Sequence, residues 1–293
     1  MRRVSGNAYS EIYFWGCNPS FIATGGGVVL VDTPQQPRDA VTWREAAAQH
    51  GPLRYLINTE PHPDHISGNA YFPGVEVIGQ VQLRSRYDEA VPGMTDPARG
   101  ELLKESDPDS VFLFNHPDYP PNPPTRTFTD ELTLKVGDHT ISCIHMPGHT
   151  KPQTSVYVPE EGVVFTGDNI FHKCKTFIQE ADPWEWLEAL DRIAALDVEL
   201  IVPGHGEPCD KEYLVEQAEI IRHWLGLVES FVDKGLSEEE ALQEPLEVQA
   251  LDPYPIGQRL FRIDEQLNDW NVRNLYRQVT SRRQGDAATR PRQ

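Results

Sequence analysis

Short apolar runs alternate with segments of helical periodicity along the first part of the chain. The runs 20–24 and 27–32 are rich in β-branched residues and meet at a glycine turn, so they predict a β-hairpin. The pattern continues with predicted helices at 38–50, 66–71 and 80–90 and predicted strands at 53–58 and 75–78. Strands that alternate with helices are typical of the α/β class.

Residues 91–127 interrupt this alternation. Six prolines lie from Pro108 to Pro124, and proline removes a backbone donor and restricts the backbone torsion φ. The segment therefore predicts an extended loop. Because a long loop inside a compact domain is usually functional, we expect this one to cover a binding site.

Alternation resumes in the second half. Strands are predicted at 131–136, 140–145, 154–158, 162–166 and 200–202, and helices at 184–196, 211–234 and 257–279. Residues 281–293 are polar and predict a disordered tail. We expect a single domain over 1–280, in which 91–127 is the cover loop and 211–280 supplies the C-terminal helices.

Composition narrows the range of partners. The chain has 45 acidic and 26 basic residues and a net charge of −19, which disfavours binding to nucleic acid or to an anionic membrane surface. No apolar run approaches the ~20 residues of a membrane span. The arginine pair near the N-terminus is followed by no apolar stretch, so we expect a cytoplasmic protein with free thiols.

Four short motifs follow predicted strands and carry metal-binding side chains. They are Glu60-Pro-His62-Pro-Asp64-His65, Pro147-Gly-His149-Thr150, Thr166-Gly-Asp168-Asn169 and Pro203-Gly-His205-Gly206. Imidazole nitrogen and carboxylate oxygen hold divalent ions, and glycine permits close backbone approach. Seven donors exceed the needs of one tetrahedral ion, so the set predicts two metals that share a carboxylate.

The motifs resemble those of the metallo-β-lactamase superfamily, whose first motif is Thr-His-x-His-x-Asp-His. The resemblance implies a four-layer αββα sandwich with the site at one edge. It also implies the ligand roles: Glu60, His62 and His149 for one metal; Asp64, His65 and His205 for the other; Asp168 as the bridge; and Asp32 and Thr59 as bracing residues.

Glu60 departs from the family pattern, because the family usually has histidine there. Either Glu60 points away and weakens the first metal site, or its carboxylate replaces an imidazole. In the second case the site holds three carboxylates around two divalent ions. The additional carboxylate then favours binding of harder ions such as iron or manganese over the zinc that is usual in the family.

We expect a hydrolase in which a metal-bound hydroxide attacks an ester, lactone, thioester or amide-like bond, with Asp64 and Asp168 as catalytic residues. The alternatives are a non-haem iron protein that activates oxygen and a metal-poor binding module. Residues 207–211 match poorly the basic segment with which hydroxyacylglutathione hydrolases bind their thiol. Substrate contacts are predicted for His172, Lys173, Lys175, His116 and Tyr119, and the substrate is expected to be a small molecule.

Overall fold

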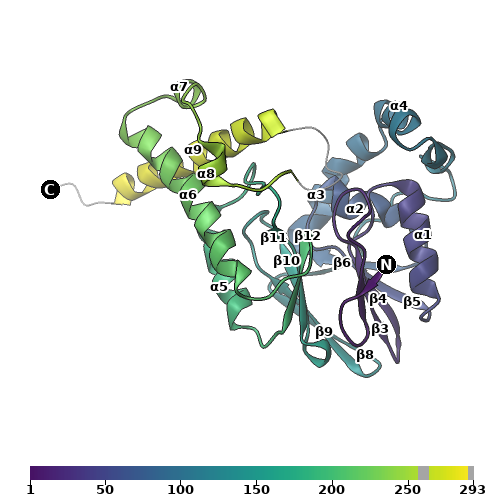
Figure 1. Cartoon of the computed structure of the whole chain (residues 1–293). Helices are drawn as coiled ribbons and strands as arrows, with labels where there is room; N and C mark the ends of the chain where they lie inside the picture. The colour runs from purple at the N-terminus through teal and green to yellow at the C-terminus, as the bar shows by residue number, and fades with distance from the viewer. Residues whose placement is uncertain (257–263, 290–293) are drawn as a thin grey trace.

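The computed structural model describes residues 1–256 and 264–289, and its strands form two sheets (Figure 1). The first sheet has the order β1 (Arg2–Arg3), β2 (Ala8–Ser10), β3 (Ser20–Thr24), β4 (Gly27–Val31), β5 (Leu53–Ile57), β6 (Glu76–Gln80) and β7 (Arg126–Phe128). The second has the order β12 (Leu200–Gly206), β11 (Val163–His172), β10 (Thr154–Val158), β9 (His139–His145) and β8 (Glu131–Val136). The predicted hairpin is confirmed, because β3 and β4 pair antiparallel.

Helices cover the outer faces of both sheets, which gives the four-layer arrangement expected for this α/β chain (Figure 1). The helices are α1 (Pro37–Ala48), α2 (Pro63–Ile66), α3 (Val81–Met94), α4 (Pro97–Ser106), α5 (Pro183–Ala195), α6 (Tyr213–Asp233), α7 (Glu238–Ala241), α8 (Val248–Leu251) and α9 (Asp264–Thr289), with short turns η1 (Ser67–Tyr71), η2 (Pro108–Leu113) and η3 (Pro159–Glu161). Among the described residues, no helix is both long and apolar enough to cross a membrane.

Strand β4 shows why its apolar run forms a central strand. Its alternate residues Val29 and Val31 face the second sheet, whereas Val28 and Leu30 pack beside Trp43 of α1. A strand that buries both faces needs a continuous apolar sequence, and this one has it. The burial of both faces holds the loop that follows β4 in place beside the candidate site.

Strands β11 and β12 run further than the sequence predicts. Their parallel pairing continues through two irregularities and brings Phe171 opposite His205. Asp168 and His205 therefore lie on paired strand ends rather than on free loops. This rigid support holds the two side chains at the same edge of the second sheet.

The prediction of an extended loop over 91–127 is wrong for most of the first half of that segment. Helix α4 and turn η2 occupy much of 97–113, and the extended part begins at Phe114. Pro97 and Pro108 each stand in the first turn of a helix, where proline lacks no hydrogen bond that the helix needs. Asp96 caps α4 by accepting from the backbone N–H of Ala98 at 2.7 Å.

The predicted disorder from Ser281 is also corrected, since α9 continues to Thr289. Two side chains in this segment contact the body of the molecule. Arg282 lies over the ring of Trp184 at 4.2 Å, and Arg283 pairs with Asp233 at 2.8 Å. Residues 290–293 of the predicted tail, and 257–263 of the predicted helix, lie outside the described residues.

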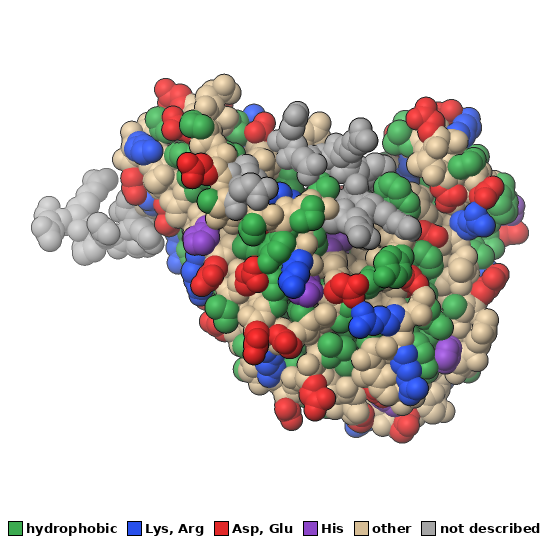
Figure 2. All heavy atoms as spheres, viewed as in Figure 1, with side chains coloured by type: hydrophobic (Ala, Val, Ile, Leu, Met, Phe, Trp, Pro, Cys, Tyr) green, Lys and Arg blue, Asp and Glu red, His purple; other side chains and the backbone are tan. Residues whose placement is uncertain are grey.

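Charge is spread over the face of the molecule that Figure 2 shows. In Figure 2 acidic side chains are distributed across the viewed face, with basic side chains among them. The net charge of −19 therefore acts on this face as a diffuse field that repels anions.

Candidate metal centre

The side chains of the four sequence motifs meet where the strand ends of the two sheets come together. Glu60 follows β5, and His62 stands at the N-terminus of α2, which carries Asp64 and His65. The remaining members of the cluster are His149 from the β9–β10 loop, Asp168 from β11 and His205 from β12. All seven predicted ligands are thus brought together from five separate places in the fold.

The first group surrounds the Glu60 carboxylate, which is fully buried and points inward. Glu60 Oε2 lies 2.8 Å from His62 Nδ1, and His149 Nε2 lies 3.2 Å from the same His62 atom. His149 Nε2 is also 3.7 Å from Asp168 Oδ2. The carboxylate that replaces the usual histidine therefore faces the cluster.

The second group consists of Asp64, His65 and His205. His205 Nε2 lies 3.2 Å from Asp64 Oδ2 and 3.3 Å from Asp168 Oδ2. His65 Nε2 lies 3.1 Å from Asp168 Oδ1. Asp168 thus has neighbours in both groups, because its Oδ2 lies near His149 and His205 and its Oδ1 lies near His65.

Several buried atoms in this cluster have close neighbours but no aligned hydrogen bond among the described residues. They are both carboxylate oxygens of Glu60, Nε2 of His65 and Oδ1 of Asp168. Buried polar atoms normally have hydrogen-bond partners, so such a concentration needs an explanation. Atoms that converge on a shared cation would have this arrangement, and the residues therefore fit a metal.

Charge in the cluster is balanced between imidazoles and carboxylates. Burial lowers the pKa of His205, but Asp168 and Asp64 outweigh that effect and raise it to about 10. Burial raises the pKa of Asp168, but His205 and His65 outweigh that effect and hold it well below its ordinary value. The ionised carboxylates are therefore stabilised by nearby positive charge, which protons on the imidazoles or bound divalent cations can supply.

Asp32 braces the first motif, as the resemblance implied. Its carboxylate accepts from the backbone N–H of Thr59 at 2.7 Å and from the Thr59 hydroxyl at 2.6 Å. The same carboxylate lies 2.9 Å from His65 Nδ1. This contact fixes the imidazole so that Nε2 points into the cluster, which is the usual way a carboxylate orients a metal-binding histidine.

Glu180 is a supporting residue that the sequence analysis missed. Its carboxylate lies 2.7 Å from His62 Nε2 and 2.8 Å from Arg86 of α3. His62 therefore has Nδ1 toward Glu60 and Nε2 held by Glu180. No motif surrounds Glu180 in the sequence, so only the folded chain reveals this contact.

The last motif needs its glycine for steric reasons. A Cβ on Gly204 would lie 1.9 Å from Asp168 Oδ1 and 2.7 Å from the backbone of Gly167. Asn18 holds this loop from the other side, because its side-chain amide donates to the carbonyls of Pro203 and Gly206 at 2.9 and 2.7 Å. The loop can therefore approach Asp168 closely and remain in place.

A cavity of about 220 Å³ opens onto the cluster. Phe171, Phe177 and Trp270 line it together with five of the predicted ligands, so it has an apolar wall opposite a charged one. The sequence analysis did not single out these aromatic residues, because each belongs to an ordinary apolar pattern.

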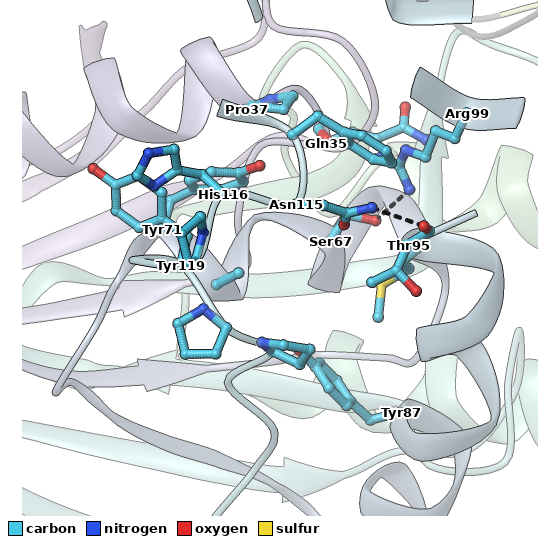
Figure 3. Close-up of a pocket in the computed structure, with 16 residues that line it drawn as sticks. Gln35, Pro37, Ser67, Tyr71, Tyr87, Thr95, Arg99, Asn115, His116 and Tyr119 are labelled. Carbon is cyan, nitrogen blue, oxygen red and sulfur yellow. Dashed lines mark hydrogen bonds between the residues drawn. The ribbon is translucent and has the colours of Figure 1, made fainter. Parts of the chain in front are cut away.

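The predicted substrate residues are divided among different places. His172 and Lys173 line a neighbouring cavity of about 430 Å³ that also reaches His205. Lys175 is absent from the linings of both cavities and donates to the carbonyl of Asp252. His116 and Tyr119 line a separate cavity of about 270 Å³ (Figure 3).

Comparison with known proteins identifies the family. A model of the metallo-beta-lactamase superfamily matches residues 12–205, well over half of the chain. The chain therefore belongs to this superfamily. The residues with ligand chemistry all lie within the matched segment.

Curated relatives include hydrolases of different kinds. A hydroxyacylglutathione hydrolase of Erythrobacter litoralis is 26% identical over 198 residues, which cover 68% of this chain and 63% of the relative. An atrochrysone carboxyl ACP thioesterase of Aspergillus fumigatus is 27% identical over 222 residues, which cover 75% and 60%. The chain thus spans less than two thirds of the length of these relatives.

Solved structures agree with the fold. A metallo-beta-lactamase family protein from Thermus thermophilus has a TM-score of 0.65 at 18% identity, covering 96% of this chain and 94% of that protein. The sec-alkylsulfatase Pisa1 from Pseudomonas has a TM-score of 0.67 at 16% identity, covering 99% and 52%. The expected fold class is confirmed by these structures and by the family match.

Proposed function

We propose that this chain uses two divalent metal ions to hydrolyse an ester, lactone, thioester or amide-like bond in a small organic substrate. The observation that carries the proposal is the convergence of three carboxylates and four imidazoles in two groups that meet at Asp168. The buried atoms of Glu60, His65 and Asp168 that lack an aligned hydrogen bond support it, because a shared cation would suit these atoms together.

The two groups suggest how the ions would be held. Glu60, His62 and His149 would hold one ion. Asp64, His65 and His205 would hold the other, and Asp168 would lie between them. Zinc accepts this donor set, and the additional carboxylate of Glu60 favours iron or manganese.

Bound divalent ions would lower the pKa of a water molecule and stabilise the charge that develops on a carbonyl oxygen. Asp64 is suited to proton transfer because its side chain is 17% exposed, against 5% for Asp168 and none for Glu60. It lines the cavity and can therefore accept a proton and pass it to the leaving group. Phe171 and Phe177 would limit the access of bulk water.

The substrate class follows from the cavity and from the charge. A volume of about 220 Å³ suits part of a small molecule. The excess of acidic residues disfavours a polyanion such as RNA. Because the names of the relatives include both a thioesterase and an alkylsulfatase, the bond that is cut needs a direct test.

The experiment is a panel of chromogenic esters, lactones, thioesters, lactams and phosphodiesters assayed with the metal-loaded protein. We expect hydrolysis of one class, loss of that activity after chelation, and recovery when metal is returned. The proposal fails if the metal-loaded protein cleaves none of them, or if chelation leaves the activity intact.

A second candidate is a non-haem iron protein that activates oxygen. The buried, inward carboxylate of Glu60 favours it, since carboxylate-rich sites suit iron. Oxygen uptake by the iron-loaded protein, without hydrolysis of the panel, would favour this candidate over the hydrolase.

A further inference from the structure

The cavity that His116 and Tyr119 line shares one lining residue, Gln35, with the cavity that opens onto the candidate metal centre. It has a volume of about 270 Å³, and residues of the extended part of the proline-rich segment, including His116 and Tyr119, form part of its wall (Figure 3). Its wall includes the rings of Tyr71, Tyr87, Phe114 and Tyr119. Flat aromatic walls of this kind suit a flat apolar group.

Arg99 of α4 brings a positive charge to this aromatic cavity. Its guanidinium donates to the Ser67 hydroxyl at 3.0 Å and to the Gln35 carbonyl at 3.1 Å. These contacts use two of five N–H donors. In the described part of the chain, no carboxylate lies within ion-pair distance of Arg99, whereas Arg38, Arg84 and Arg86 each have an acidic partner.

This arrangement is unusual for a half-buried cation. Burial lowers the pKa of Arg99, and the charges of Tyr71 and the more distant Asp64 offset this desolvation only in part. An anion that enters the cavity would supply the missing partner. Because the chain as a whole has a net charge of −19, a substrate with a carboxylate also needs a local cation to bind.

We propose that this cavity binds the non-reacting end of the substrate, and that this end is a flat apolar group that carries a carboxylate paired with Arg99. The inference rests on the proposed hydrolase function for the reaction itself. The planar guanidinium matches a carboxylate in geometry, and the aromatic wall excludes water around the pair. The scissile bond would then extend past Gln35 toward the metal ligands.

The test compares 3-phenylpropanoate with its uncharged isostere 3-phenylpropanamide by calorimetry. The full chain is used after metal removal, so that metal ions cannot bind the carboxylate. We expect the carboxylate to bind at least tenfold more tightly than the amide. Equal binding of the two probes to the wild-type chain would overturn the inference.

Variants separate recognition from folding. Arg99→Met should reduce the preference for the carboxylate to less than twofold, and Arg99→Lys should keep part of it. Ala70→Leu fills part of the cavity without removing Arg99, so it should weaken the binding of both probes to the same extent. The exposed control Arg222→Met should bind both probes as the wild type does. A preference that survives Arg99→Met also overturns the inference.

The two proposals can fail independently. Probe discrimination without hydrolysis of any compound would remove the hydrolase function and leave the carboxylate site standing. Hydrolysis of a compound without discrimination between the two probes would remove the carboxylate site and leave the hydrolase function standing. Where a hydrolysed substrate carries a distal carboxylate, Arg99→Met should raise KM at least tenfold and change kcat little.

Discussion

The carboxylate of Glu60 and the imidazole of His62 face each other at 2.8 Å, between Oε2 and Nδ1, in the buried part of the candidate metal centre. Since the same His62 atom lies 3.2 Å from His149 Nε2, a carboxylate and two imidazoles surround one point. The glutamate that departs from the family motif therefore faces the same point as two of the proposed ligands, as our proposal for the first metal ion requires. Its charge should govern which metal the centre prefers.

Substitution of Glu60 tests that preference. Glu60→His restores the usual family residue and removes one negative charge, so zinc affinity should rise relative to manganese affinity. Competition titrations of both proteins against a chelator measure this ratio. An unchanged ratio between zinc and manganese would show that Glu60 does not bind metal.

Glu180 should position His62 for metal binding. Glu180→Gln weakens the contact with His62 Nε2 and should lower metal affinity by about 10- to 100-fold, the usual cost of losing such an outer partner. The exposed Glu185→Gln serves as the control with the same chemical change. Equal metal affinity in the two variants would assign Glu180 no positioning role.

Gly204 should be irreplaceable on steric grounds. In Gly204→Ala the added Cβ would collide with Asp168 and with the backbone of Gly167, so we expect a lower melting temperature and loss of bound metal. Gly226 of α6 has open space around its Cβ position. Gly226→Ala should therefore stabilise the helix by about 0.5–1 kcal/mol. Thermal unfolding measures the melting temperatures of both variants. Similar shifts of the melting temperature in the two variants would contradict the steric role of Gly204.

His139 should make stability depend on pH. Its Nδ1 lies 2.8 Å from Asp138 and its Nε2 lies 2.9 Å from Glu161. Burial lowers the pKa of His139, but Glu161 and Asp138 outweigh that effect and raise it above 6.5. Folding therefore favours the protonated imidazole. That stabilisation is complete below pH 6.5 and is lost as pH rises through the raised pKa.

His139→Gln should accordingly reduce the free energy of unfolding more at about pH 6 than at about pH 9. Chemical denaturation at both pH values measures the difference. The exposed His223→Gln serves as the control with the same chemical change. Equal losses for His139→Gln at the two pH values would mean that the imidazole is neutral throughout.

The parts of the fold that could be predicted have strong local patterns. The apolar run of β4 buries Val29 on one face and Leu30 on the other, so its strand character is evident without tertiary information. The candidate ligand motifs follow such apolar runs in the sequence. The residues of the cluster could therefore be predicted as candidate ligands from their residue types and from the predicted strands beside them, and the structure brings them together.

The rest depends on contacts between distant segments. Glu180 lies in a loop without periodicity, and its role arises only because His62 and Arg86 come to meet it. Arg99 belongs to α4, in the segment that proline content assigned to an extended loop. Composition alone does not distinguish a proline in the first turn of a helix from a proline in a loop. The N-cap and the buried face of α4 distinguish the two, and both are visible only in the structure.

The shared position of Asp168 is the central claim about the candidate metal centre. Elemental analysis of the wild-type chain and of Asp168→Ala, purified alike and dialysed against the same buffer, tests it most directly. We predict about two metal equivalents in the wild type and at most one in Asp168→Ala, because one side chain would serve both ions. A wild-type chain without bound metal, or a variant that retains two equivalents, would contradict the account.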